Sequence, residues 1–245
     1  MTEPITTIYW LMQTATEVPA ADDWLTAGEL ATAAGLRVAK RRNDWRLGRW
    51  TAKRAVAAYL RRDATALVGS FPRDRSAELA LIEIRAADDG APEVVLDQQR
   101  APLSISLSHS AGLGLCAVGR GDAAIGCDVE RIEPHSAAFI ADFFAAEEQA
   151  AIARVSAADK PQWTTLLWSA KESALKALRE GLRLATRSAV VTVPEALPVC
   201  GWRPLSVRYA ATGEVFDGCW RATEHYLLTL VAFPGRYQPQ ALRSP

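Results

Sequence analysis

Asp128 and Glu130 alternate with three apolar residues in the segment 125–130, and this pattern constrains the fold most strongly. Successive side chains of a β-strand point to opposite faces, so residues two apart lie on the same face. The segment therefore predicts a strand that carries two carboxylates on one face and apolar side chains on the other.

A second segment, which begins at Trp168, has the spacing of a helix. Trp168, Glu172 and Lys176 follow one another at intervals of four, which lines them up along one side of a helix. We expect a helix over 161–180 that ends before Gly181, with Glu172 and Lys176 away from its buried stripe. The apolar residues that form this stripe are Trp163, Leu167, Ala170, Ala174 and Leu178.

Two carboxylates on a strand, and a carboxylate with an ammonium on a helix, suit a divalent cation bound to a phosphate. Mg²⁺ takes one or two protein carboxylates and completes its shell with water and phosphate oxygens. A lysine adds a point of positive charge for the phosphate. A structural interpretation stays open, because an edge strand often has a solvated acidic face and Glu172 with Lys176 fits a helix-surface ion pair.

The rest of the chain alternates predicted strands and helices, which indicates an α+β fold. Asp89-Gly90 is a dipeptide suited to a tight hairpin turn between two short strands. Residues 1–36 are poorly patterned apart from one strand. The expected strands cover 5–12, 79–85, 93–96, 103–108, 113–118 and 226–233, and the other expected helices cover 38–61 and 137–154.

Positive charge is concentrated in the helix predicted over 38–61. Between residues 40 and 54 only Asp44 is acidic, although the whole chain has a net charge of zero. A local cluster fits a compact polyanion such as a nucleotide phosphate, whereas nucleic-acid binding spreads positive charge over more of a domain. A solvated charged face is the structural alternative. The basic residues are Lys40, Arg41, Arg42, Arg46, Arg49, Lys53 and Arg54.

Ser108 and His109 stand where the strand 103–108 runs into a turn of small residues. The imidazole and the hydroxyl can both donate to a phosphate oxygen, and such turns are where ligand contacts collect. A lone histidine is more often structural than functional, so both interpretations stay open. The turn at 89–92, read alone, is only a hairpin.

Composition is that of an ordinary globular protein, and it limits the cellular context. No run approaches the roughly 18 to 20 apolar residues of a membrane span, and the first residues lack the pattern of a signal peptide. The cysteines form no CxxC pair, so we expect buried free thiols in a reducing cytoplasm rather than a zinc site or disulfides. They are Cys116, Cys127, Cys200 and Cys219.

A weak internal repeat relates the two parts of the chain. Two pairs of short segments resemble each other at offsets of 118 and 114 residues, namely 50–56 with 168–174 and 113–118 with 227–232. Together they favour two similar halves, 1–120 with the basic helix and the Ser-His turn, and 121–245 with the acidic motifs. In this alignment Arg54 takes the position of Glu172.

Taken in order, these motifs resemble the Sfp-type 4′-phosphopantetheinyl transferase family. The similarity rests on G-x-D-x-E, here Gly126 to Glu130, and on W-x-x-K-E-x-x-x-K, here Trp168 to Lys176. It is reinforced by the basic helix and by the turn and aromatic motifs, which are Ser108-His109 and Phe143-Phe144 with Glu148 downstream. The motifs cover residues 40 to 185, about three fifths of the chain, and five of them in this order are specific.

The resemblance implies an enzyme that transfers the 4′-phosphopantetheine arm of coenzyme A to a serine of an apo acyl or peptidyl carrier protein and releases 3′,5′-ADP. It implies an α+β fold of two pseudo-duplicated halves, each a small antiparallel sheet with helices, and an active site between them. It also implies a cytoplasmic monomer with Mg²⁺ or Mn²⁺ as metal, coenzyme A as co-substrate, and no nucleic-acid or membrane partner.

By the same resemblance, Asp128, Glu130 and Glu172 hold the metal on the pyrophosphate. Glu172 also accepts the serine proton, directly or through a metal-bound water, and Lys176 stabilises the phosphate or the departing ADP. The catalytic residues are then Glu172, Lys176 and His109. The expected contacts to coenzyme A are Arg41, Arg49, Lys53, Gly90, Pro92, Ser108, His109 and Lys176.

Some positions depart from the family pattern, and two other functions stay open. Ala91 stands where relatives commonly have a lysine, and Glu29 and Thr32 fall where some have lysines. The rival functions are a non-catalytic protein that binds coenzyme A or a nucleotide, and a metal-dependent phosphohydrolase. An apolar group fits either a helix core face or a docking surface for the carrier: Phe139, Ile140, Phe143 and Phe144.

Overall fold

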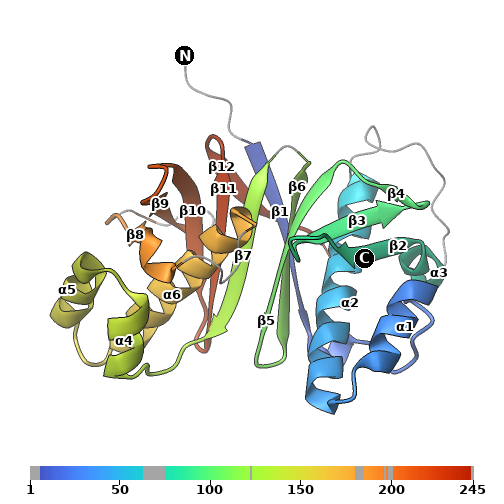
Figure 1. The fold of residues 1–245 in the computed structure, drawn as a ribbon, viewed down its shortest axis with the longest axis horizontal. Helices are drawn as coiled ribbons and strands as arrows, with labels where there is room; N and C mark the ends of the chain where they lie inside the picture. The colour runs from blue at the N-terminus through green and yellow to red at the C-terminus, as the bar shows by residue number, and fades with distance from the viewer. Residues whose placement is uncertain are drawn as a thin grey trace. The chain divides into compact units, whose positions relative to one another are not determined.

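The computed structural model describes residues 6–62, 75–121, 123–179, 185–195, 197 and 201–243. Contacts within the chain divide it into two units, one of residues 8–122 with 240–245 and one of residues 123–239 with 1–7. We call them the N-terminal unit and the C-terminal unit and describe each by itself (Figure 1). Both combine helices with antiparallel strands, which confirms the predicted α+β class.

The N-terminal unit packs one long helix against a four-stranded sheet of order β12-β1-β6-β5. The strands are β1 (Thr6–Thr14), β5 (Leu103–Ser110), β6 (Leu113–Arg120) and β12 (Tyr237–Ala241), and the long helix is α2 (Ala39–Arg62). A second sheet has the order β2-β3-β4, with β2 (Ile82–Ala86), β3 (Pro92–Leu96) and β4 (Gln99–Arg100). The remaining elements are the 3-10 turn η1 (Ala15–Glu17) and the helices α1 (Ala27–Gly35) and α3 (Arg75–Ala80).

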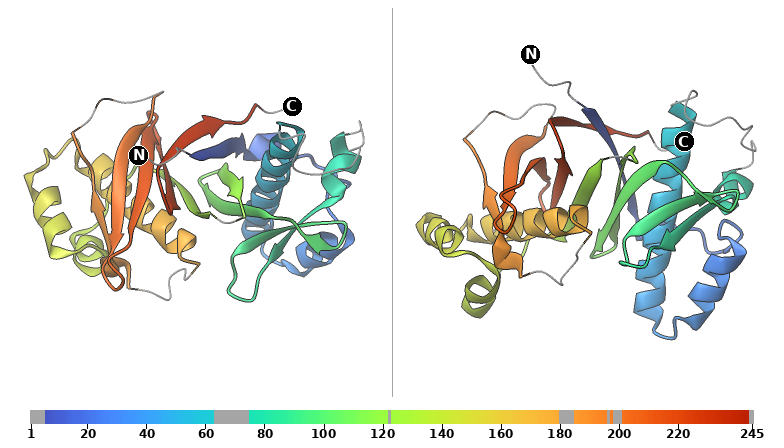
Figure 2. Two further views of the ribbon diagram at one scale, coloured as in Figure 1. Left: turned by 90° about the horizontal axis from the view of Figure 1, so that it is seen from above. Right: turned by 45° about the horizontal axis from the view of Figure 1, so that its top comes forward.

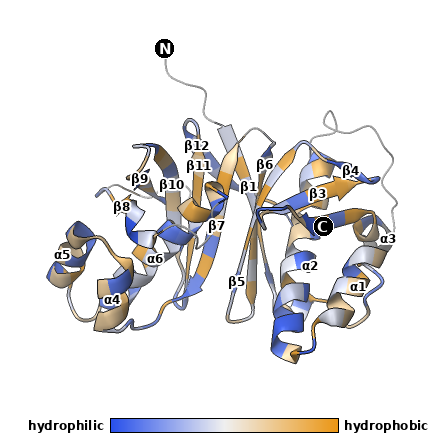
Figure 3. Ribbon diagram, viewed as in Figure 1, coloured by the Kyte–Doolittle hydropathy of each residue, from blue (hydrophilic) through white to orange (hydrophobic). Residues whose placement is uncertain are grey.

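Helix α2 is hydrophilic where it begins, yet its middle lies in the core (Figure 3). Val56 and Ala52 are fully buried in a cluster with Ile84 and Val118 from the strands. The helix approaches β6 closely at Gly114, where a Cβ would stand 2.5 Å from Thr51 Oγ1. A residue without a side chain is therefore required at this crossing.

The C-terminal unit consists of a five-stranded antiparallel sheet with one long helix along one face (Figures 1 and 2). The sheet order is β7-β11-β10-β9-β8. The strands are β7 (Ala124–Arg131), β8 (Ala189–Thr192), β9 (Arg203–Tyr209), β10 (Val215–Ala222) and β11 (Tyr226–Phe233). The helices are α4 (Ala137–Phe143), α5 (Ala146–Arg154) and the long α6 (Lys160–Ala177), with the 3-10 turn η3 (Thr186–Ser188) before β8.

Gly126 sets the distance between α6 and β7. A Cβ at this position would overlap the backbone carbonyl oxygen of Ser173 and stand 2.7 Å from its carbon. Because residues two apart share a face of a strand, Gly126, Asp128 and Glu130 all lie on the face that α6 covers. The glycine of the G-x-D-x-E motif thus lets the helix come down onto the strand beside the carboxylates.

Most predicted elements are confirmed with ends within three residues, among them α2, α6, β1 and β11. The stripe of apolar residues predicted on α6 also lies in or against the core. Of the four cysteines, Cys116 and Cys127 are buried free thiols and Cys219 is a partly buried one. Cys200 and Gly181 lie outside the described residues.

The structure differs from the expected local structure at three places. The helix expected over 137–154 is broken at Phe144, which adopts an extended conformation (φ −107°, ψ 144°) with its side chain fully buried. The strand expected over 79–85 is present as β2 but begins only at Ile82, because residues 79 and 80 belong to the short helix α3. Helix α1 was not expected, although Thr26 and Glu29 form a capping box, which is a sequence-level signature of a helix start.

Candidate functional site

In the C-terminal unit an ion pair joins the strand and helix motifs. Asp128 on β7 is 2% exposed, and Lys176 Nζ on α6 donates to its Oδ1 at 2.8 Å. The same ammonium donates to the backbone carbonyl of Cys127 at 3.1 Å. The strand motif of β7 and the helix motif of α6 are therefore brought together within one unit.

Glu172 lies one helical turn before Lys176 and adds a second carboxylate to this group. Burial is the main cause that raises the pKa of Glu172, Asp128 raises it further, and Lys176 opposes both. Its Oε1 atom is buried and has no hydrogen-bond partner among the described residues. A buried carboxylate oxygen without a donor is an acceptor for which a cation is the natural partner.

Lys176 keeps its charge although burial acts against it. Burial alone would lower the pKa of Lys176, but the charge of Asp128, with contributions from Cys127 and Glu172, raises it above its ordinary value. The group therefore holds a fixed positive charge beside two carboxylates. This arrangement suits a site that receives both a cation and a phosphate.

Glu130 is half-buried, two residues beyond Asp128 on the same face of β7 and opposite Leu227 of β11. Within the part of the chain that the structure describes, no three His, Cys, Asp or Glu side chains form a metal-binding group. Asp128 and Glu172 alone meet what Mg²⁺ requires, since it takes one or two protein carboxylates and fills its shell with water and phosphate oxygens. The residues present therefore fit a bound Mg²⁺. The predicted set of three ligands, in which Glu130 joins Asp128 and Glu172, stays a prediction.

A network of buried hydroxyls supports the site, and the sequence reasoning did not identify it. Thr229 of β11 pairs in register with Asp128. Its Oγ1 lies 2.7 Å from Ser173 Oγ and 2.9 Å from Ser169 Oγ, and it donates to the carbonyl of Ser169 at 3.0 Å. These bonds fix α6 on the sheet at the level of Asp128. The small polar residues at 169 and 173, one helical turn apart, were the available signal.

In the N-terminal unit, Arg49 has the properties of an anion-binding group. Burial lowers the pKa of Arg49, and the charge of Glu29 opposes this effect. Its guanidinium lies over the ring of Trp45 at 4.9 Å, and its buried Nε has no hydrogen-bond partner among the described residues. Arg41 is exposed and lies two turns earlier on the same side of α2.

His109 lies near the end of β5 and beside α2. It is exposed and pairs with Gly114 of β6, and a Cβ at Gly48 would stand 4.0 Å from its Cδ2 atom. Ser108 is half-buried next to it. The structure thus brings the predicted histidine close to the turn of α2 that carries Arg49.

The predicted contact of Lys53 with coenzyme A requires a correction. Its side chain is 0% exposed, it forms an ion pair with Glu29, and its ammonium donates to the carbonyls of Trp24 at 2.9 Å and Leu79 at 3.1 Å. The three N–H donors are therefore all used inside the N-terminal unit. The expected contact between Lys53 and a phosphate is wrong, and a structural role replaces it.

Gly90 and Pro92 lie in the hairpin between β2 and β3. Gly90 has a φ of +88°, a conformation that favours glycine, and Pro92 is the first residue of β3. Asp89 accepts a hydrogen bond from the Ala91 backbone N–H at 2.9 Å. The hairpin geometry by itself accounts for both predicted residues, and their contact with coenzyme A stays a prediction.

The aromatic residues before and within α4 form a cluster with Trp168. Phe139 stacks on His135 with ring centroids 4.5 Å apart and meets Trp168 at 5.0 Å. Burial lowers the pKa of His135, so its ring is more readily neutral. Phe144 is fully buried, which confirms the core interpretation for that residue, whereas Phe143 is half-buried.

Comparison with known families supports the resemblance over part of the chain. Residues 124–237 match the model of the 4′-phosphopantetheinyl transferase superfamily, a segment just under half of the chain. The matched segment includes Asp128, Glu130, Glu172 and Lys176. A comparison with curated proteins gives no match. Similarity to phosphopantetheinyl transferases is therefore confirmed for this segment, and the Sfp type stays a prediction.

Proposed function

We propose that this chain is a Mg²⁺-dependent 4′-phosphopantetheinyl transferase of the Sfp type. It would move the 4′-phosphopantetheine arm of coenzyme A to a serine of an apo acyl or peptidyl carrier protein and release 3′,5′-ADP. The observation that carries the proposal is the buried Glu172 Oε1 beside the Asp128–Lys176 ion pair, in a segment that matches this superfamily.

The chemistry is a phosphoryl-type transfer, which depends mostly on positioning and charge. The serine oxygen forms a bond to the phosphorus next to the pantetheine arm, and the bond from this phosphorus to the bridging oxygen breaks. Glu172 would accept the serine proton, because a carboxylate placed beside the reacting hydroxyl can act as a general base. The departing 3′,5′-ADP keeps the electron pair on the bridging oxygen, and the Lys176 ammonium stabilises that charge.

Asp128 and Glu172 would hold the cation, with Glu130 as the third ligand. A bound Mg²⁺ supplies charge neutralisation on the pyrophosphate oxygens. Mn²⁺ could serve in place of Mg²⁺, because both ions prefer carboxylate and water oxygens as ligands. Within the chain, the hydroxyl network around Thr229 keeps α6 at the level at which both carboxylates can contribute.

The N-terminal unit would bind the phosphates of coenzyme A. Arg49 supports this assignment best, since its guanidinium is partly desolvated and its Nε lacks a partner among the residues described. Arg41, Ser108 and His109 are proposed as further contacts, with Gly90 and Pro92 from the hairpin. Lys53 is not part of this set.

The protein is further proposed to act as a cytoplasmic monomer that does not bind nucleic acid or membranes. The three described cysteines are free thiols, which suits a reducing compartment. Its macromolecular partner would be the carrier protein.

The test is mass spectrometry of a panel of apo carrier proteins incubated with the protein, coenzyme A and Mg²⁺. We expect one phosphopantetheine to be added to the carrier, and no addition with EDTA or with a carrier whose serine is replaced by alanine. Glu172→Gln should lower the rate by about 10²–10⁴-fold while coenzyme A still binds. Glu133→Gln, an exposed site in the same unit, is the matched control and should transfer normally.

Two outcomes would contradict the proposal. Bound coenzyme A with no mass gain on any carrier would indicate a binding protein. Release of nucleotide or phosphate without a carrier would indicate a hydrolase.

A further inference from the structure

Among the described residues, each unit has one buried lysine–glutamate pair, and the proposed transfer chemistry uses neither. In the N-terminal unit Lys53 pairs with Glu29, and the two side chains are 0% and 4% exposed. In the C-terminal unit Lys171 pairs with Glu148 at 2.7 Å, and these side chains are 0% and 2% exposed. Charged side chains are almost never fully buried unless they are paired, so each pair requires an explanation.

Lys171 and Glu148 connect three segments of the C-terminal unit. The Lys171 ammonium on α6 also donates to the carbonyls of Thr186, at 3.1 Å, and Ala189. Glu148 stands in the first turn of α5 and accepts the backbone N–H of Ala145 at 2.8 Å and that of Val191 in β8 at 3.0 Å. Helix α6, the start of α5 and strand β8 are therefore joined at one point.

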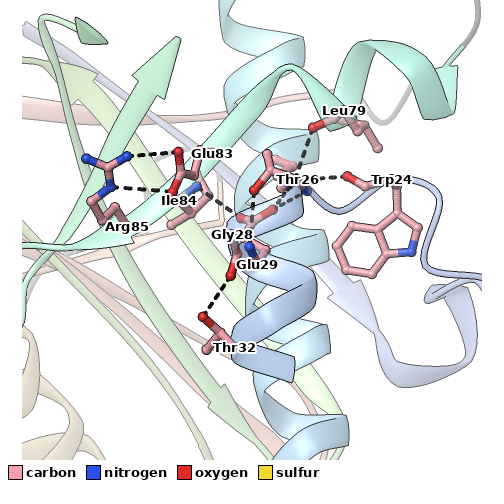
Figure 4. Close-up of polar contacts among 10 residues, drawn as sticks. Trp24, Thr26, Gly28, Glu29, Thr32, Leu79, Glu83, Ile84 and Arg85 are labelled. Carbon is pink, nitrogen blue, oxygen red and sulfur yellow. Dashed lines mark hydrogen bonds and ion pairs between the residues drawn. The ribbon is translucent and has the colours of Figure 1, made fainter. Parts of the chain in front are cut away.

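Lys53 and Glu29 make a similar set of contacts in the N-terminal unit. Glu29 stands in the first turn of α1 and accepts the backbone N–H of Thr26 at 3.0 Å and that of Ile84 in β2 at 3.1 Å (Figure 4). Lys53 on α2 donates to two backbone carbonyls, those of Trp24 and Leu79. A short helix, a long helix and a strand again meet at one buried pair.

The lysine, the glutamate and a nearby aromatic residue correspond in the two sets. Lys53 and Lys171 are related by the offset of 118 residues that the sequence repeat shows, and the glutamates by 119. Each ammonium also lies 5.7 Å from the ring of a fully buried aromatic residue that precedes the short helix, Trp24 or Phe144. In both cases all three N–H donors of the lysine are used and the glutamate accepts two backbone N–H groups.

Each pair restricts the movement of the helix on which its lysine lies. A slide or rotation of α6 would pull Lys171 away from Glu148 and leave an uncompensated charge in the core, which is strongly unfavourable. Lys171 directly precedes Glu172 on α6, and Lys53 lies one turn after Arg49 on α2. The pairs therefore hold the two helices that carry Glu172 and Arg49.

We propose that the two pairs are positioning residues with separate tasks. The Lys171–Glu148 pair sets α6 so that Glu172 and Lys176 meet Asp128, and the Lys53–Glu29 pair sets α2 so that Arg49 is presented to a phosphate. The kinetic consequences rest on the proposed function. The structural claim, that each pair restrains its own long helix, does not.

The experiment compares two matched double variants in which each pair is replaced by apolar residues of similar size, Lys171→Met with Glu148→Leu, and Lys53→Met with Glu29→Leu. Removal of both partners avoids the isolated buried charge that a single substitution leaves. For the first variant we expect kcat to fall at least tenfold with the dissociation constant for coenzyme A within twofold of wild type. For the second we expect that dissociation constant to rise at least tenfold and kcat to change little.

Amide hydrogen exchange supplies a readout that needs no activity. Exchange in peptides covering 168–176 should rise at least fivefold in the first variant and peptides covering 48–58 should stay unchanged, with the reverse in the second. A general loss of stability would instead raise exchange in both helices and reduce kcat and binding alike, and that result overturns the proposal. Unchanged exchange in both helices would also overturn it.

Two controls separate the possible failures. If a double variant does not fold, Lys171→Met with Glu148→Gln and Lys53→Met with Glu29→Gln take its place with the same readouts, because glutamine keeps one acceptor oxygen for the backbone and no buried charge is left unpaired. If the wild-type protein transfers nothing to any carrier, the proposed function fails, and the exchange pattern alone then supports or overturns the positioning role.

Discussion

Burial acts in opposite directions on the two ionisable groups of α6 that face Asp128. It raises the pKa of Glu172 and works to lower the pKa of Lys176, because it disfavours the charged form of each. The charge of Asp128 raises the pKa of both. Glu172 is therefore a carboxylate that readily takes up a proton, and Lys176 beside it is an ammonium that keeps its proton.

The raised pKa of Glu172 predicts how stability depends on pH in metal-free protein. The folded state binds a proton at Glu172 more tightly than the unfolded chain does, so the ionised carboxylate destabilises the fold at neutral pH. In EDTA, Glu172→Gln should be more stable than wild type at pH 7, and the difference should shrink as pH falls through the raised pKa towards the ordinary value of 4.5. Urea unfolding at several pH values measures this, and a difference that grows at acidic pH would contradict it.

Gly126 is predicted to tolerate no side chain, because a methyl group there would overlap the Ser173 carbonyl of α6. Gly126→Ala should cost about 3 kcal/mol or more in the free energy of unfolding, since backbone atoms rather than flexible side chains must move. Gly35→Ala is the control, because nothing lies within 4 Å of a Cβ added at this position. This variant should be as stable as wild type or up to about 1 kcal/mol more stable. Equal effects of the two substitutions on chemical unfolding would refute this account.

At the scale of elements, the β5–β6 hairpin has a turn residue that does not match its backbone. Ala111 and Gly112 have φ values of +46° and +83°. A two-residue hairpin loop with a type I′ turn requires positive φ at both positions, and Asn-Gly is the preferred pair there. Ala111→Asn should therefore stabilise the protein by about 1 kcal/mol, whereas Ala111→Val should destabilise it by a similar amount. Thermal unfolding distinguishes the two, and a stabilising valine would show that the turn does not keep this conformation.

The sequence predicted elements well where periodicity was strong and poorly where a buried contact decides. The alternation at 125–130 and the spacing along α6 gave β7 and α6 nearly in full. The break between α4 and α5 is not periodic in the sequence: it arises because Phe144 is buried and because Glu148 accepts the Ala145 N–H. A continuous helix over 137–154 was the natural expectation without these contacts.

The candidate site shows the same limit. Motif spacing was sufficient to place Asp128, Glu172 and Lys176, because one strand and one helix carry them all. It failed for Lys53, since nothing in a row of basic residues tells which one turns inward to Glu29. The small polar residues at 169 and 173 could mark a buried polar contact on α6, but they could not identify Thr229 as the partner, because that depends on the pairing of strands about 100 residues apart in the sequence.

At the scale of the whole molecule, the proposed metal couples binding to stability. A ligand that binds only the folded state stabilises it, by about 1.4 kcal/mol at ten times its dissociation constant. Mg²⁺ should therefore raise the thermal midpoint of the wild type relative to EDTA at matched ionic strength, and Glu172→Gln should remove most of this increase. An equal increase in both proteins would place the cation elsewhere.

Strand β12 has a consequence for the order in which the protein is made. It pairs with β1, and the backbone N–H of Leu242 donates to the carbonyl of Trp10 at 2.8 Å, so the sheet of the N-terminal unit is completed by residues near 240. During synthesis these residues follow Asp122 by about 120 positions, a delay of roughly 6 to 24 s at ~5–20 residues per second. For that interval one side of β1 has no neighbouring strand, so a nascent chain offers an open sheet edge to chaperones and to other chains.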